Sequence, residues 1–201
     1  MAIAGVLLGI IIFSAGALII AYDKIMYPIN YKKEILTASE EFSVDPILVA
    51  SVINAESRFK IDAVSEKGAV GLMQLKPSTA EWVVKQISQQ EATNTMMTSA
   101  DESSLKDILY DTETHSGELL DPGINIRIGT FYLSYLLKKF DTTDLALCAY
   151  NAGEGTVKTW LANEEYSKDG KSLDKIPYKE TQNYIEKIHR NLKVYSKKLN
   201  V

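Results

Sequence analysis

The pattern of apolar and polar residues divides the chain into one long apolar stretch and several segments with helical spacing. The apolar stretch comes first, since residues 2–22 contain no charged side chain. At about 1.5 Å per helical residue, this length is sufficient to cross a hydrocarbon core about 30 Å thick, whereas a helix in a soluble domain normally has a polar face. The pattern therefore predicts an N-terminal membrane anchor at residues 1–23.

Two features leave the processing and the direction of this segment open. Small residues at 14–17 offer a cleavage site for a signal peptide, but the apolar run continues through 18–20, which favours an uncleaved anchor. No basic residue precedes the span, while Lys24 and Lys32 follow it, so the positive-inside rule would place the rest of the chain in the cytoplasm. The chemistry described below predicts the opposite orientation.

After the anchor, the sequence predicts a short polar connector at 24–40 and a folded domain at 41–201. Near the start of this domain, Asp45 can cap a helix whose first residue is Pro46 and which runs to about Glu56. A carboxylic acid is thus expected at the end of an apolar helix.

The middle of the domain alternates between irregular and helical sequence. The glycine-rich stretch 65–77 is expected to be irregular or briefly extended, before a helix at 77–87. Residues 88–120 are polar and predict an insertion with at most a short helix at 104–110. Insertions of this length are usually functional or mobile.

The last third of the chain predicts three helices. The first begins at the Asp-Pro pair 121–122, and the second is a short apolar helix that Gly153 and Gly155 are expected to stop. The third begins at Tyr178 and carries an apolar stripe of Tyr184, Ile188, Leu192, Tyr195 and Leu199. No strand alternation or internal repeat is apparent, so the sequence predicts a mainly α domain.

Composition and charge narrow the possible functions. The chain is 46% hydrophobic, enough for a core, and its net charge of −4 provides no basic surface, so no nucleic-acid partner is expected. The single cysteine, Cys148, lies in an apolar run and is expected to be a buried, inert thiol. The only histidines, His115 and His189, form no ligand spacing, so neither a metal nor another cofactor is expected.

Glu56 is the candidate for chemistry. The negative end of a helix dipole and the apolar neighbours Val52 and Ile53 both disfavour the ionised carboxylate, which raises its pKa. An acid that is protonated near neutral pH can act as a general acid in the cleavage of a glycosidic bond. The motif "NAESRF" alone, however, is more typical of an exposed glutamate at a helix end, paired with Arg58.

Downstream motifs change this interpretation. "ESRF" at 56–59 is followed by Ser65, "GAVGLMQ" at 68–74, "AYNAGEGTV" at 149–157 and "ETQNYIEKI" at 180–188. In this order, the motifs resemble the lytic transglycosylase domain of the soluble lytic transglycosylase family. The resemblance implies a lysozyme-like helical fold of the goose type and action on bacterial peptidoglycan.

The resemblance also implies roles for individual residues. Glu56 matches the catalytic acid of the family. The positions that match substrate-contacting residues are Ser65, Met73, Gln74, Tyr150, Asn151, Glu180 and Tyr184. Taken alone, Met73 and Tyr150 are more typical of core residues. Lys76 departs from the family, which often has an apolar residue there, and a cation facing Glu56 would lower the pKa of that acid.

The mechanism that the resemblance implies needs only one acid. Glu56 would protonate the oxygen linking N-acetylmuramic acid to N-acetylglucosamine, and the acetamido group of the muramic acid would close on the anomeric carbon. The ionised Glu56 would then take the proton of the 6-hydroxyl, which attacks to form a 1,6-anhydro end. Because peptidoglycan lies outside the membrane, this reaction predicts an extracytoplasmic domain held at the cell membrane by residues 2–22.

Two alternatives remain open. A muramidase would hydrolyse the same bond with water activated by a second carboxylate, such as Asp62 or Glu66, which lie in loop-like sequence. A peptidoglycan-binding scaffold would keep the fold without catalysis, although the intact motifs argue against that.

Overall fold

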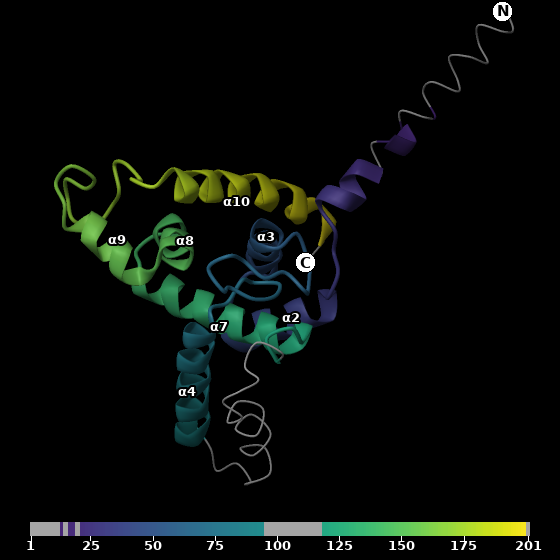
Figure 1. Cartoon of the computed structure of the whole chain (residues 1–201), viewed down its shortest axis with the longest axis horizontal. Coiled ribbons are helices and arrows are strands. Elements are labelled where there is room, and N and C mark those ends of the chain that lie inside the picture. The colour runs from purple at the N-terminus through teal and green to yellow at the C-terminus, as the bar shows by residue number, and fades with distance from the viewer. Residues whose placement is uncertain (1–12, 14–15, 19–20, 95–117, 200–201) are drawn as a thin grey trace, which may run out of the picture.

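The structure is a computed structural model that describes residues 13, 16–18, 21–94 and 118–199. Within these residues the domain is mainly α, as predicted (Figure 1). Its helices are α2 (Lys32–Phe42), α3 (Pro46–Glu56), α4 (Pro77–Asn94), α7 (Pro122–Lys139), α8 (Thr143–Ala152), α9 (Glu154–Leu161) and α10 (Lys179–Lys198).

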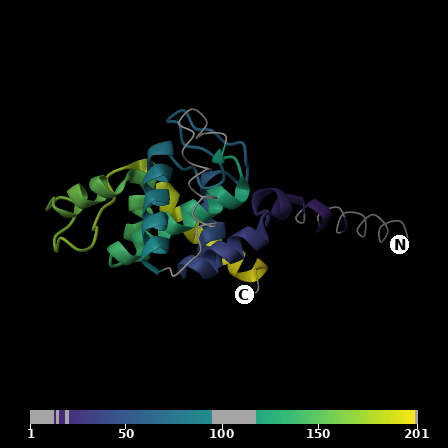
Figure 2. The same cartoon turned by 90° about the horizontal axis from the view of Figure 1, so that it is seen from below.

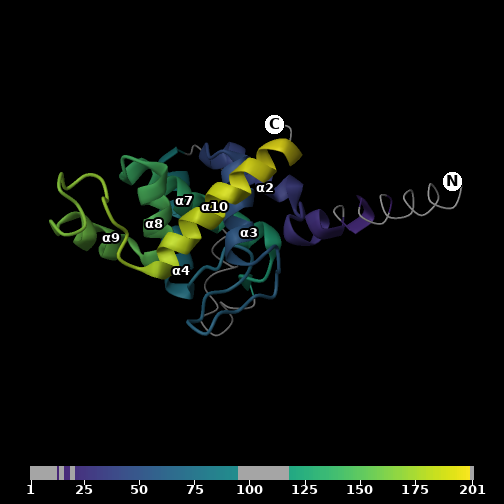
Figure 3. The same cartoon turned by 90° about the horizontal axis from the view of Figure 1, so that it is seen from above.

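Helix α3 is the central element. Every residue from Leu48 to Ala55 is buried, so this helix is covered on all sides, as expected for a helix without a polar face. Helix α10 packs along α3 and α8, while α7 packs against α2, α4 and α8 (Figures 1 and 3). The C-terminal end of α3, which carries Glu56, is thereby enclosed by elements from distant parts of the chain.

The structure confirms that helices begin at both Asp-Pro pairs. Asp45 accepts a hydrogen bond from the backbone N–H of Ile47 at 2.8 Å, and Asp121 accepts one from Ile124 at 2.9 Å. In each case proline is the first helical residue, where its missing N–H costs no hydrogen bond. Local capping chemistry is sufficient to fix both starts.

Two predicted boundaries differ from the structure. Gly153 ends α8 with a φ of 92°, but Gly155 lies inside α9, so the prediction that Gly155 also stops a helix is wrong. Helix α4 continues to Asn94, so the expected insertion at 88–120 begins as helix. The short helix expected at 104–110 lies outside the described residues.

Most of the predicted anchor also lies outside the described residues. Residues 21–26 are helical and lie at the edge of the domain (Figure 2). Across 13, 16–18, 21–94 and 118–199, no helix is long and apolar enough to cross a bilayer. Large apolar side chains at Phe13 and Ile25 are 80% and 72% exposed.

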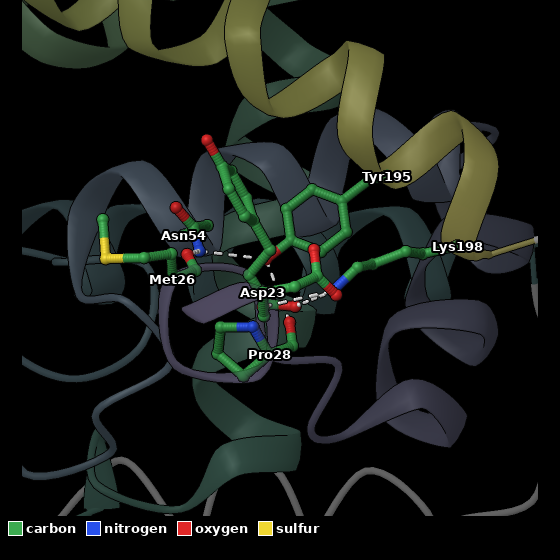
Figure 4. A network of polar contacts seen from close by, with 7 residues as sticks. Asp23, Met26, Pro28, Asn54, Tyr195 and Lys198 are labelled. Atoms are coloured by element: carbon green, nitrogen blue, oxygen red, sulfur yellow. Dashed lines mark hydrogen bonds and ion pairs between the residues drawn. The ribbon is translucent and has the colours of Figure 1, made fainter. Parts of the chain in front are cut away.

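The segment expected as a polar connector packs onto the domain. Helix α2 begins within it, continues to Phe42 and buries Ile35 completely in the core. Before α2, Lys198 near the end of α10 forms an ion pair of 2.6 Å with the carboxylate of Asp23 and donates to the backbone oxygen of Tyr27 at 2.7 Å. This polar network joins residues 23–27 to the end of α10 (Figure 4).

A second part of the network reaches α3. Asn54 donates through Nδ2 to the backbone oxygen of Met26 at 2.8 Å and to the hydroxyl of Tyr195 at 2.9 Å. Tyr195 in turn donates to the backbone oxygen of Pro28 at 2.9 Å (Figure 4). Asn54 and Tyr195 are buried, so the 23–29 segment supplies acceptors for polar groups near Glu56.

Candidate active site

Glu56 is the last residue of α3 and is partly buried. Burial raises the pKa of its carboxyl to about 7, while Tyr184 and Lys187 oppose the shift and the charge of Glu180 adds to it. Burial is the cause that the sequence predicted from the apolar neighbours. Glu56 is therefore partly protonated at neutral pH, as a general acid must be.

Helix α10 brings two groups to this carboxyl. Tyr184 interacts with Glu56, is 7% exposed, and its hydroxyl has no well-aligned hydrogen-bond partner among the described residues. One turn further, Lys187 donates through Nζ to the backbone oxygen of Ala55, at the end of α3. The cation thus sits beside the acid and also satisfies a carbonyl at the end of the helix.

Tyr150 approaches Glu56 from α8. Its hydroxyl donates to the backbone oxygen of Met73 at 3.0 Å. Burial, and next the negative charge of Glu56, raise the pKa of Tyr150 and of Tyr184 well above the usual phenol value. Both phenols therefore stay protonated at any working pH and can donate hydrogen bonds in the site.

The glycine-rich loop is held by its own polar groups. Ser65 accepts through Oγ from the N–H of Ala69 at 2.9 Å, and Gln74 donates through Nε2 to the backbone oxygens of Ala63 and Gly71 at 3.1 and 3.0 Å. Isolated bridges pair Val70 with positions on either side, in line with the irregular or extended expectation. Ser65 and Gln74 thus both shape this loop.

Asn125 of α7 fastens the loop to the core. It accepts from the N–H of Met73 at 2.8 Å and donates to the backbone oxygens of Val70 and Leu119 at 3.1 and 2.8 Å. A Cβ at Gly71, whose φ is +77°, would lie 2.3 Å from Asn125 Nδ2. The close approach therefore requires glycine.

Replacing Asn125 with Ala is expected to lower the free energy of unfolding by about 2 to 4 kcal/mol, because three buried backbone groups lose their partner. Chemical denaturation measures this loss. The exposed Asn183, replaced in the same way, is the matched control and should change stability by no more than about 0.5 kcal/mol. Equal midpoints for the two variants would contradict the role of Asn125.

The other predicted residues fall into two groups. The side chain of Met73 is fully buried against Gly129, in the core. Asn151 accepts through Oδ1 from the hydroxyl of Thr181 at 2.8 Å and so joins α8 to the start of α10. Glu180, beside Thr181, is exposed, and its carboxylate pairs with Lys67 of the glycine-rich loop at 3.4 Å.

The charges around Glu56 differ from those considered in the sequence. Lys76 is exposed and is not among the groups that perturb the pKa of Glu56. The cation that does so is Lys187, which sequence reasoning missed although it lies one turn after Tyr184 on the same helix. Asp62 and Glu66 are exposed, and the only carboxylate among the perturbing groups is Glu180.

Cys148 follows the expectation from its apolar context. Its side chain is buried, and burial raises the pKa of the thiol to about 12. Such a thiol is not a nucleophile at neutral pH. In the described part of the chain, no cluster of three or more histidine, cysteine or acidic side chains could hold a metal ion.

Comparison with known proteins identifies the family. Residues 33–173 match the family described as the transglycosylase SLT domain. The soluble lytic murein transglycosylase of Escherichia coli strain K12 is 33% identical over 140 residues, which cover 69% of this chain and 18% of that protein. Membrane-bound lytic murein transglycosylase E of Buchnera aphidicola is 32% identical over 111 residues, covering 55% of this chain and 41% of that protein.

Solved structures agree. An inactive mutant of lytic transglycosylase Slt from Pseudomonas aeruginosa matches with a TM-score of 0.67 and 28% identity, covering 89% of this chain and 26% of that one. The 70-kDa soluble lytic transglycosylase from Escherichia coli matches with a TM-score of 0.63 and 26% identity, covering 85% and 25%. The chain thus spans about a fifth to a quarter of the length of these soluble relatives.

These matches, together with one partly buried acid in a mainly helical lysozyme-like domain, define the class of protein. The chain belongs to the transglycosylase SLT family of lytic transglycosylases.

Proposed function

We propose that this protein is a peptidoglycan lytic transglycosylase that cleaves the β-1,4 bond between N-acetylmuramic acid and N-acetylglucosamine. The observation that carries the proposal is the carboxyl of Glu56, whose pKa of about 7 suits it to donate a proton and to accept one. The relatives named above as lytic murein transglycosylases support the substrate class.

Glu56 acts twice in this reaction. As an acid it protonates the glycosidic oxygen, the C–O bond breaks, and the acetamido oxygen of the muramic acid bonds to the anomeric carbon. As a carboxylate it then removes the proton of the 6-hydroxyl, whose oxygen displaces the acetamido oxygen and forms the 1,6-anhydro ring. Glu56 ends protonated again, and no water is consumed.

The phenols beside Glu56 have roles in this scheme. Tyr150 and Tyr184 stay protonated. Tyr150 gives its one proton to the backbone oxygen of Met73 and can accept from the N–H of the acetamido group, whereas Tyr184 can donate to the developing carboxylate. The Tyr184 hydroxyl is well placed for such a bond, because it is buried and lacks an aligned partner among the described residues. Ser65, Gln74 and the backbone of Met73 form the loop that we assign to one side of the substrate.

The remaining predicted contacts belong to the opposite side. We assign Asn151 and Glu180, at the adjoining ends of α8 and α10, to this wall. The exposure of Glu180 suits contact with a substrate hydroxyl better than proton transfer to the scissile bond.

We also propose that the domain is extracytoplasmic and anchored to the cell membrane by residues 2–22. The apolar composition of that stretch supports the anchor, as do the exposed apolar side chains of Phe13, Leu18 and Ile25. Relatives named soluble and relatives named membrane-bound both occur in the family.

The products of the reaction test the proposal against the hydrolytic alternative. The protein without residues 1–20 is incubated with purified peptidoglycan, and the released sugars are weighed by mass spectrometry. Products that end in an anhydro sugar, one water lighter than hydrolysis products, are expected. Hydrated products would indicate a muramidase and direct attention to Asp62 and Glu66, and an absence of products would favour a binding scaffold.

The pH dependence of turnover follows from the pKa of Glu56. Because the first step needs the protonated acid, kcat is expected to fall about tenfold per pH unit above pH 7. Replacing Lys187 with Met removes a positive charge that lowers the pKa of Glu56. The fall of kcat on the alkaline side of the pH profile should therefore move to higher pH.

Two matched variants make this experiment specific. Lys187→Arg keeps the charge and should retain the parent profile, and Lys76→Met removes an exposed cation and should leave the profile unmoved. A Lys187→Met variant with lower activity but an unshifted limb would mean that Lys187 only supports the helix end.

A further inference from the structure

A pocket lined largely by aromatic side chains contains none of the candidate site residues. It has a volume of about 280 Å³ and lies where α4, α7 and α9 meet. Its lining residues are Ser78, Thr79, Trp82, Tyr132, Tyr135 and Glu154. Ligand sites commonly begin near 300 Å³, so this pocket suits one ring-sized group.

The aromatic rings give the pocket flat apolar surfaces. The rings of Tyr132 and Tyr135 are nearly parallel, with an interplanar angle of 16° and centroids 6.3 Å apart. Trp82 meets Tyr135 edge to face at 4.8 Å. All three side chains are only partly buried, so apolar ring area stays accessible beside polar hydroxyl and indole N–H groups.

The acid of the pocket is fixed in place. Glu154 accepts from the hydroxyl of Tyr135 at 2.9 Å and pairs with Lys139 and Lys158 at 2.8 and 2.6 Å. These partners hold the carboxylate in one orientation: both lysines use Oε1 and Tyr135 uses Oε2, so one acceptor position on Oε2 is left for a further donor. The wall is therefore preorganised to accept hydrogen bonds from a ligand.

The pocket is connected to Glu56 through two tyrosines. Tyr132, which lines the pocket, packs its ring against Tyr150 with centroids 5.4 Å apart. Tyr150 in turn interacts with Glu56 from α8. Tyr150 thus has contacts with both the pocket wall and the candidate acid.

We propose that this pocket binds one N-acetylhexosamine ring of the glycan strand, away from the bond that is cut. This inference rests on the proposed function. A pyranose ring has an apolar face of C–H groups, which packs on aromatic rings, and hydroxyls at its edge, which donate to a carboxylate such as Glu154. The pocket thereby makes cleavage depend on the length of the strand.

A stem peptide fits the pocket less well. Its carboxylates have no proton to donate to Glu154, which stays ionised because hydrogen bonds from Lys139, Lys158 and Tyr135 lower its pKa to about 2 despite the opposing effect of burial. Its amines would compete with Lys139 and Lys158 for the same oxygens. A neutral ring with hydroxyl donors meets neither obstacle.

The test compares short and long N-acetylchito-oligosaccharides in a Glu56→Gln background, with binding measured by calorimetry. Replacing Trp82 with Ala is expected to weaken binding of long oligosaccharides about tenfold or more and to leave short ones unchanged. Because this change also removes the packing of Trp82 on α7, Ser78→Tyr is the second variant. Ser78 is exposed, and a large side chain there fills the pocket without emptying the core. Lys85→Ala, at an exposed position one turn after Trp82, is the control.

Trp82 also reports binding directly. In a Trp160→Phe variant it is the only tryptophan of the chain, so long oligosaccharides should change its fluorescence and short ones should not. Affinity that is independent of length in the parent, or unchanged by both pocket variants, would overturn the proposal. So would a loss confined to glycan with stem peptides, because the occupant would then be peptide.

The same comparison separates this inference from the proposed function. In one outcome the parent yields anhydro products from peptidoglycan, and the pocket variants cleave short and long strands with the same ratio of rates as the parent. That outcome would overturn the proposed sugar site and leave the proposed function intact. A parent that releases no sugar from peptidoglycan would overturn both.

Discussion

Replacing Glu56 with Gln is expected to lower kcat on peptidoglycan by at least about 10³-fold, because general acid and base catalysis each contribute about 10² to 10⁴-fold and both depend on this carboxyl. The amide has nearly the same shape and can still hydrogen-bond with its neighbours, but it has no acidic proton to transfer to the glycosidic oxygen. Release of anhydro sugars, followed by mass spectrometry over time, measures the loss. Retained turnover in the variant would remove Glu56 from the mechanism.

The same variant should be more stable than the parent above pH 7. Burial raises the pKa of Glu56 in the folded state from 4.5 to about 7, so the folded state binds the proton more tightly than the unfolded chain. The free energy of unfolding of the parent therefore decreases as the pH rises from about 4.5 through 7. Gln lacks this titration, so thermal unfolding at pH 8 should favour the variant.

Matched controls come from the two loop carboxylates. Asp62→Asn and Glu66→Gln remove exposed acids that do not perturb Glu56, and both variants are expected to keep parental kcat. A large loss in either would support the hydrolytic alternative, which needs a second carboxylate.

Local rules predicted the helix carrying Glu56 well. The Asp45 cap and Pro46 set the start of α3, and an unbroken apolar run set its burial. They failed at Gly155, because glycine stops a helix only where the backbone needs a positive φ. Gly153 has a φ of 92°, and Gly155 is accommodated inside α9.

The long-range contacts in the site could not be predicted from local sequence patterns. The cation that matters lies on α10, where Lys187 contacts Ala55 across 132 positions of sequence. Lys76 follows the GLMQ motif closely, so the sequence suggested a cation near Glu56, yet the structure leaves Lys76 exposed. Asn125 was missed because its partners are backbone groups of the loop, which have no signal in the sequence.

The contribution of residues 23–29 was hidden for the same reason. Their polar composition predicted a connector, whereas their backbone carbonyls serve as acceptors for Asn54, Tyr195 and Lys198. The side chains of Tyr27 and Ile29 also pack against the core. Composition describes side chains only, and here the main chain makes many of the contacts.

Removing residues 1–29 is therefore expected to destabilise the domain by about 2 to 4 kcal/mol relative to removing residues 1–20. Each deletion eliminates most of the predicted anchor, but only the longer one removes the acceptors of the buried Asn54 and Tyr195. Burying an unsatisfied donor costs about 1 to 3 kcal/mol. Chemical denaturation of the two truncated proteins measures the difference.

The longer deletion should also lower kcat, because Asn54 lies two residues before Glu56 at the end of α3. In the shorter protein, Tyr195→Phe isolates the hydroxyl: it removes the bonds to Asn54 and Pro28 and keeps the ring, and should cost about 1 kcal/mol. Ser196→Ala, next to it on the exposed side of α10, is the control. If both truncated proteins unfold at the same denaturant concentration, residues 23–29 are a tether and not part of the domain. If they differ as expected, this segment is part of the folded domain that holds α3 and Glu56.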